Sequence, residues 1–128
     1  MSISVPVSWG ELIDKITILE IKQCEIKDET ALANVRRELA ALTSVLEQSG
    51  ANHPELAEKK AALLEINREL WGIEDDIRDC ERGQDFGDDF IRLARAVYHT
   101  NDRRAAVKKE INILLGSELV EEKSYQDY

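Results

Sequence analysis

The sequence predicts an all-α fold, an antiparallel four-helix bundle dominated by one long helical hairpin. Composition is the first indication: of 128 residues, 34% are charged and 43% hydrophobic, with only 2 prolines and 6 glycines, as is typical of helix-rich proteins. The second is a run of apolar residues at heptad spacing from Leu56 onward, and the third is its interruption at Gly83–Gly87. The length suits a single domain over residues 1–128.

The N-terminal part predicts an extended arm followed by a helix near residues 9–27. Residues 1–7 alternate apolar and polar side chains and include Pro6, which indicates an extended segment or an edge strand. Ser8 and Glu11 have the spacing of a capping box, in which each side chain satisfies a free backbone amide at the start of a helix.

The first two helices differ in how their apolar residues are distributed. In the first, Ile18 and Ile21 lie off the main apolar face, so we expect it to be wedged between neighbours or placed at a subunit interface. A second, ordinary amphipathic helix is predicted near residues 29–48, with Asp28 or Thr30 as its N-cap. Its apolar residues at heptad spacing are Leu32, Val35, Leu39, Leu42 and Leu46.

The long hairpin is predicted from two helices near residues 54–82 and 88–115. Pro54 suits the first helical position, and Gly116 suits the C-terminal cap. Beyond it, the tail at 117–128 either adds a short helix or stays without regular structure. The apolar residues of the two helices are Leu56, Leu63, Ile66, Leu70, Ile73, Ile77 and Cys80, then Phe90, Leu93, Ala94, Val97, Ile111, Leu114 and Leu115.

Charge and cysteine content exclude several classes of function. The net charge of −9 argues against nucleic acid and anionic lipid as partners, because both require a basic surface. No apolar run is long enough to span a bilayer. Cys24 and Cys80 fall on apolar stripes, and the start of the chain lacks the pattern of a signal peptide. We therefore expect buried free thiols, a cytoplasmic location and no cofactor.

Polar residues interrupt the apolar stripes at corresponding points. Asn101 and Arg104 replace apolar residues in the second hairpin helix, and the register of the hairpin places Arg104 opposite Asn67. Glu20 is similarly placed in the first helix, and Arg104 is its natural counter-ion. The cluster is either a ligand pocket or a buried structural network, and we favour the structural role for Arg104. The candidate pocket residues are Glu20, Gln23, Asn67, Asn101 and Arg104.

A basic segment adds two candidates for anion binding. Between Arg92 and Lys109 there are six lysines and arginines and one acid, Asp102, so His99 and Arg103 could join Asn101 and Arg104 in binding a phosphate or carboxylate. The alternatives are that the arginines pair with acids of the neighbouring helix and that His99 is a surface or interface residue. No catalytic residue is predicted, because no serine or cysteine has a base and an orienting acid nearby in the sequence.

An acidic run surrounds the predicted hairpin turn, and Glu74, Asp75 and Asp79 are the weak metal candidates within it. Arginines are interspersed with these acids, so a solvated tip with surface ion pairs is the simpler interpretation and no metal site is predicted. Glu11-x-x-Asp14 and its counterpart at 25–28 are similar to the acidic motifs of all-α nucleotide pyrophosphohydrolases, but the remaining motif of those enzymes is missing.

Three long motifs carry a resemblance to a family. They are VPVSWGELIDKITILEIK at 5–22, LWGIEDDIRD at 70–79 and YHTNDRRAAVKKEINILLGSELVEEKSY at 98–125. They resemble a family of small bacterial helical domains of unknown function, so the resemblance implies a fold but no catalytic residue. The first helix is also similar in pattern to that of helical chorismate mutases, but it lacks the basic residues that hold a dicarboxylate.

The sequence therefore predicts a non-enzymatic module for oligomerisation or protein interaction, assembled as a homodimer or a higher homo-oligomer. The apolar residues Ile18, Ile21 and Trp71 fall off the main stripes, and a monomer would expose them. The alternative is a small enzyme or binder that acts on an anionic metabolite such as a nucleotide, a sugar nucleotide or a phosphate ester, with or without a divalent metal ion.

Overall fold

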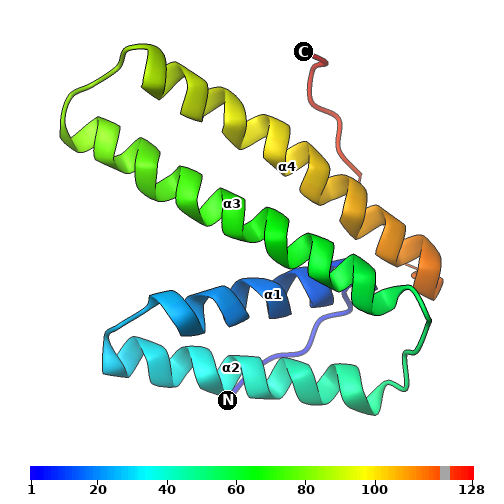
Figure 1. Cartoon of the computed structure of the whole chain (residues 1–128). Coiled ribbons are helices and arrows are strands. Elements are labelled where there is room, and N and C mark those ends of the chain that lie inside the picture. Colours follow the sequence, from blue (N-terminus) through cyan, green and yellow to red (C-terminus); the bar gives the residue numbers. More distant parts are fainter. Residues whose placement is uncertain (119–121) are drawn as a thin grey trace.

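The computed structural model describes residues 1–118 and 122–128, and within these ranges the fold is all-α, as predicted. Figure 1 shows the four helices in chain order. They are α1 (Trp9–Glu25), α2 (Glu29–Gln48), α3 (Leu56–Arg82) and α4 (Asp88–Leu115).

Local capping explains where most of these helices begin and end. The Ser8 hydroxyl accepts a hydrogen bond from the Glu11 amide, and the Asp28 carboxylate accepts one from the Ala31 amide at the start of α2. Gly116 adopts the left-handed conformation, with φ of 67°, which ends α4 as predicted. Glycine is favoured there because other residues are strained at positive φ.

Two predicted helix ends are displaced by two residues. Helix α1 ends at Glu25 instead of residue 27, because Ile26 is already extended and leads into the Asp28 cap. Helix α3 begins at Leu56 instead of residue 54, because His53 and the next two residues form a turn in which the Leu56 amide donates to the His53 carbonyl at 3.0 Å.

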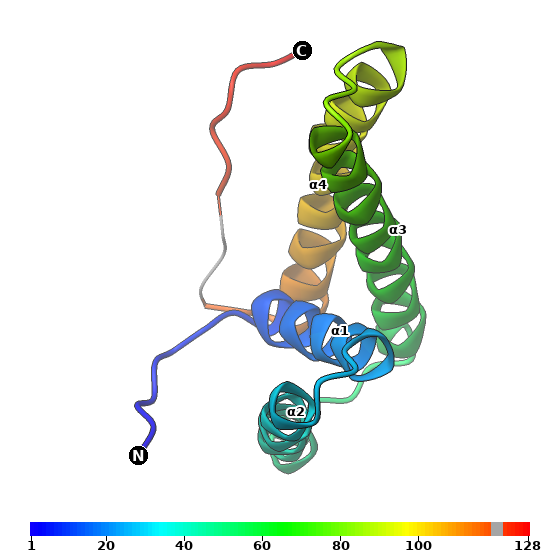
Figure 2. The same cartoon turned by 90° about the vertical axis from the view of Figure 1, so that its left-hand side faces the viewer.

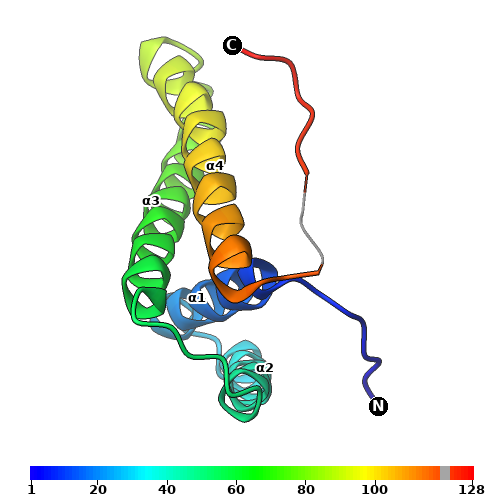
Figure 3. The same cartoon turned by 90° about the vertical axis from the view of Figure 1, so that its right-hand side faces the viewer.

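Helix α1 is the centre of the fold. It packs against α2 on one side and against the base of the α3–α4 hairpin on the other, so α2 lies on the side of α1 away from the hairpin (Figures 2 and 3). The fully buried Ile13, Leu63 and Ile111 bring α1, α3 and α4 into one core. Ile21 is also buried, so α1 is wedged between neighbours, one of the two alternatives expected for it.

The hairpin extends well beyond α1. We call residues 72–100, the outer part of α3 and α4 with the turn between them, the distal hairpin (Figure 1). Glu74 and Arg78 in it still line a cavity shared with α1, and Tyr98 and His99 lie beside Tyr128 of the tail. The chain has an accessible surface of 9000 Å², whereas a compact monomer of 14.6 kDa is expected to expose about 6,900 Å². The fold therefore exposes about 2,100 Å² more than a compact protein of its size.

The two cysteines are less buried than predicted. Cys24 is exposed because it lies in the last turn of α1, beyond the part of that helix which the hairpin covers. Cys80 is half-buried between α3 and α4, where burial and then the nearby carboxylates of Asp85 and Asp89 raise the pKa of its thiol.

The chain termini lie outside the helical core. Residues 1–7 form an exposed extended arm, and residues 122–128 run beside α4 without regular structure (Figures 2 and 3). The short helix considered for the tail falls partly on residues 119–121, outside the described ranges.

Candidate functional site

A buried carboxylate lies where α1 crosses the hairpin. The side chain of Asp14 on α1 is only 2% exposed, and that of Arg104 on α4 is 28% exposed. Arg104 Nε donates to Asp14 Oδ1 at 2.9 Å, and Arg104 Nη2 donates to Asp14 Oδ2 at 2.5 Å. This bidentate geometry is the strongest form of arginine–carboxylate pairing, and it neutralises the buried charge.

Side chains of α1 and α3 complete the polar network around Asp14. Asn67 Nδ2 donates to Asp14 Oδ1 at 3.0 Å and to Thr17 Oγ1 at 2.9 Å, and the Thr17 hydroxyl donates to the Asp14 carbonyl at 2.7 Å. Across residues 1–118 and 122–128, every buried side-chain nitrogen and oxygen has a hydrogen-bond partner. The network is therefore closed and does not present an unsatisfied group for chemistry.

The contact between α1 and α4 continues as an antiparallel ladder toward the N-terminus of α1. Lys108 lies one turn after Arg104 and is buried, and its ammonium group pairs with the Glu11 carboxylate at 2.8 Å. The next step is neutral, because the Gly10 amide donates to Asn112 Oδ1 at 2.6 Å. Along this contact, Glu11 of α1 thus pairs with Lys108 of α4, and Asp14 pairs with Arg104.

Gly10 allows this close approach of the two helices. A Cβ atom at this position would lie 2.4 Å from the Lys108 carbonyl oxygen and 2.9 Å from Asn112 Oδ1. Any larger residue would therefore push the start of α1 away from the backbone of α4. The Ser117 hydroxyl closes this end of the ladder by accepting a hydrogen bond from the Trp9 amide at 2.9 Å.

The structure brings together three of the predicted pocket residues, namely Asn67, Asn101 and Arg104. Glu20 does not pair with Arg104 as expected, but with Lys60 at a partly exposed position, at 3.0 Å. The reason is rotational, since six residues separate it from Asp14 and place it about 120° around the helix. The remaining pocket candidate, Gln23, is exposed.

The other two anion-binding candidates lie on the surface of α4. Arg103 pairs with Glu69 of α3 at 2.8 Å, with both side chains largely exposed, as the pairing alternative expected. His99 is exposed, and its ring lies 4.9 Å from the ring of Tyr98 and 4.4 Å from that of Tyr128, between centroids. Arg103 and His99 are therefore not part of the buried network around Asp14.

The weak metal candidates do not converge. Glu74 pairs with Arg78 one turn later on α3, Asp79 lies 3.5 Å from Arg82, and Asp75 is exposed. Among the residues that the structure describes, no three acidic, histidine or cysteine side chains are grouped as metal ligands. The acidic tip is laced with surface ion pairs instead.

The most buried members of the network were not among the predicted site residues. A usable signal was present, because the polar Asp14 and Thr17 interrupt the apolar residues of α1 at helical spacing from Gly10. Sequence reasoning missed Thr17, Lys108 and Asn112, and it noted Glu11 and Asp14 only as an acidic motif and not as members of the pocket.

Two cavities border the network, and Asn101 and Arg104 line both. The smaller, of about 440 Å³, lies between the C-terminal half of α1 and the hairpin. It is lined by Ile18, Ile21, Asn67, Leu70, Trp71, Glu74, Asp75, Arg78, Asn101 and Arg104.

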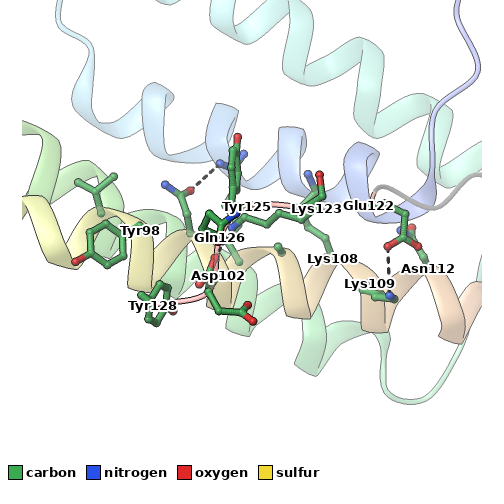
Figure 4. A pocket seen from close by; sticks show the side chains of 16 residues that line it. Tyr98, Asp102, Lys108, Lys109, Asn112, Glu122, Lys123, Tyr125, Gln126 and Tyr128 are labelled. Atoms are coloured by element: carbon green, nitrogen blue, oxygen red, sulfur yellow. Dashed lines mark hydrogen bonds and ion pairs between the residues drawn. The ribbon is translucent and has the colours of Figure 1, made fainter.

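The larger cavity, of about 1170 Å³, lies between α4 and the tail (Figure 4). Lys123 of the tail pairs with Asp102 of α4, and Glu122 lies 3.8 Å from Lys109. Hydrogen bonds from Lys123 and, to a smaller extent, from Tyr128 lower the pKa of Asp102. The hydrogen bond between Tyr128 and Asp102 also raises the pKa of Tyr128. Exposed charge pairs thus hold the tail against α4, and such pairs are weak in water.

These observations define an all-α protein built on a long helical hairpin, in which the charged residues at the helix crossing neutralise one another. No helix in the described ranges is sufficiently long and apolar to cross a membrane. The chain belongs to a family of unknown function, DUF6165, whose model matches residues 3–128. Neither the curated proteins nor the solved structures contain a match.

Proposed function

We propose that this chain is a non-enzymatic helical module that associates with a second copy of itself. The observation that carries the proposal is the accessible surface of 9000 Å², which exceeds the value for a compact monomer by about 2,100 Å². The exposed arm at 1–7 and the tail at 122–128 contribute part of this excess, and the open hairpin contributes to it as well. An average interface buries about 800 Å² on each partner. The hairpin therefore needs to supply less than half of this excess to match what one copy contributes to a stable dimer.

The distribution of apolar side chains supports self-association through the hairpin. Phe86 and Ile91 near its tip are 49% and 53% exposed. Ile73, Ile77 and Phe90 are only half-buried, because two helices cannot enclose the seam between them. Apolar surface that stays exposed in a protein otherwise rich in charge is typical of a protein–protein interface, and further exposed apolar residues lie on the arm, α2 and the tail.

The polar network supports a structural role and not catalysis. Asp14 is held by a bidentate arginine and by Asn67, which supports the role of a neutralised structural ion pair over that of a base or a metal ligand. Both cysteines are free, which supports placement in a reducing compartment such as the cytoplasm.

Sedimentation velocity tests the proposal directly. Between about 1 and 100 μM, a range that covers common dimer affinities, we expect a species of twice the 14.6 kDa chain mass, with a monomer appearing only on dilution. A single monomeric species over the whole range would refute self-association.

A second candidate is a binder of an anionic metabolite in the smaller cavity. The observation that favours it is that two guanidinium groups, Arg78 and Arg104, line the cavity together with the indole of Trp71. Because these arginines pair with Glu74 and Asp14, an anion would have to compete with those carboxylates. Thermal shift with phosphate, nucleotides and sugar nucleotides, with and without Mg²⁺, tests it. Stabilisation that is lost in Arg78→Ala, a change at an exposed position, would favour the binder; no stabilisation by any of these compounds would exclude this class.

A further inference from the structure

We infer that the smaller cavity, at the start of the distal hairpin, is a binding site for a small organic cation, an ammonium or guanidinium group on a compact apolar body. This inference goes beyond the proposed self-association and does not depend on it. It also differs from the anion binder, because the ion pairs already formed in the cavity leave a carboxylate as the charge without a partner.

The two arginines of the cavity are already neutralised. Arg104 is held by Asp14 through two hydrogen bonds, at 2.9 and 2.5 Å, and Arg78 pairs with Glu74 one turn earlier on α3. An anion would have to displace one of these carboxylates, whereas a cation would leave both pairs intact. The paired arginines also repel an incoming cation less than isolated ones would, since a carboxylate lies against each guanidinium group.

The remaining carboxylate of the cavity wall is that of Asp75. Among the residues that the structure describes, no lysine, arginine or histidine pairs with it. With Asp14 counted, three carboxylates and two arginines meet here, a net charge of −1. The surroundings have the same sign, because residues 74–89 contain eight carboxylates and two arginines. Such a negative potential raises the local concentration of cations.

The indole of Trp71 gives the cavity a second group that attracts cations. Trp71 lies one turn before Asp75 on α3, so the two side chains are on the same side of the helix, and both line the cavity. The face of an indole is the best cation–π partner among side chains. In residues 1–118 and 122–128, the cation–ring contact is that of Lys123 with Tyr125, so no cation of this chain occupies the indole of Trp71.

The rest of the cavity suits the apolar body of such a ligand. Ile18, Ile21 and Leu70 line it, and its volume of about 440 Å³ lies in the usual range of small-molecule pockets. A metal ion fits less well, because it needs several oxygen ligands together, and no three acidic, histidine or cysteine side chains of the described ranges are grouped in that way. A single side chain of a protein partner would fill only part of this volume.

The first experiment compares choline with its uncharged isostere, in which a tert-butyl group replaces the trimethylammonium group. The chain has two tryptophans, so NMR follows two indole N–H resonances. Trp9 packs against the core and does not line the cavity, which makes it an internal control. At constant ionic strength, we expect choline to shift the Trp71 resonance alone, with a dissociation constant of about 1 to 10 mM. The isostere should bind at least about 10-fold more weakly.

Several outcomes would overturn the cation site. Equal binding of the isostere would show an apolar cavity without preference for charge. A shift of both indole resonances together, or no shift of Trp71 at about 50 mM choline, would show that choline does not bind in the cavity. A lysine tripeptide that shifts Trp71 when choline does not would assign the cation to a protein partner, and a shift with phosphate alone would favour the anion binder.

The second experiment repeats the choline titration with Asp75→Asn and Asp76→Asn. The two aspartates are a matched pair, since they are adjacent and exposed on α3, and only Asp75 lines the cavity. We expect Asp75→Asn to weaken choline binding roughly 3- to 10-fold, as the loss of one nearby opposite charge implies. Asp76→Asn should weaken it by less than about 2-fold, because water and salt screen its charge.

Circular dichroism of both variants should match that of the wild type, because both positions are exposed. Equal weakening by the two variants would show that the general acidity of the hairpin tip attracts choline, and it would overturn the site. So would an Asp75→Asn variant that binds choline as tightly as the wild type.

Discussion

Replacing Arg104 by Met should destabilise the fold by about 3 kcal/mol. The change removes the bidentate partner of Asp14, whose side chain is 2% exposed, and leaves its carboxylate with Asn67 as a hydrogen-bond donor. Breaking a fully buried pair typically costs about 3 to 5 kcal/mol. Because Arg104 itself is 28% exposed, we expect a value near the lower end. At this chain length, such a loss lowers Tm by roughly 11 °C.

Two further variants show whether the loss of stability in Arg104→Met comes from the unpaired buried carboxylate or from the change of side-chain size and helix propensity. Arg103→Met changes the adjacent residue, whose pair with Glu69 is largely exposed, and should cost less than about 1 kcal/mol. The double variant Asp14→Leu, Arg104→Met removes both charges, and Asn67 keeps Thr17 Oγ1 as an acceptor. It should therefore be more stable than Arg104→Met alone, and close to wild type.

Urea denaturation followed by circular dichroism at fixed protein concentration gives all three free energies of unfolding. Equal losses in Arg104→Met and Arg103→Met would refute the structural role of the network. So would a double variant no more stable than Arg104→Met, because the cost would not then come from an unpaired buried carboxylate.

Three further predictions concern the helix contact, the half-buried Cys80 thiol and the tail. Gly10→Ala should destabilise the fold by about 1 to 3 kcal/mol, because its Cβ would meet the α4 backbone at 2.4 Å. Gly72→Ala, with open space around its Cβ, should stabilise α3 by about 0.5 to 1 kcal/mol in the same urea assay. The Cys80 thiol, whose pKa is raised by burial and by acids, should react with iodoacetamide more slowly than an ordinary thiol at pH 8. Added salt should speed the reaction if the acids contribute, as quantitative mass spectrometry can measure. Asp102, whose pKa is lowered by its contacts with the tail, favours the docked tail above its ordinary pKa of 3.8. Docking should therefore be lost as the pH falls below that value, seen by NMR as release of the Tyr128 ring; a ring that stays in place at pH 2 would contradict this.

The helices could be predicted because their signals are local. Ser8 and Asp28 cap helices through amides three residues away, and Gly116 ends one through its own backbone conformation. The two displaced ends depend on the connections. Residues 26–28 must be extended to cap α2, and the turn after His53 delays α3.

The partner of Arg104 could not be predicted with the same certainty. Helix α1 carries acids on several sides, and the rotation of the helix about its axis decides which one faces the hairpin. The prediction chose Glu20, but the close approach at Gly10 turns Asp14 inward, and Glu20 pairs with Lys60 instead. The presence of a buried arginine pair was thus readable from the interrupted stripe, whereas its acidic member depended on tertiary packing.

The ladder between α1 and α4 also constrains the order of folding. Its contacts join residues separated by 90 to 108 positions in the chain, whereas α3 and α4 are joined by a short turn. Closing a short loop loses less entropy, so the hairpin can form early, while α1 must wait for α4 to be complete. Until then the Asp14 carboxylate remains in water, and its burial belongs to the last stage of folding. The ladder should accordingly slow the unfolding of the folded protein more than it speeds its folding.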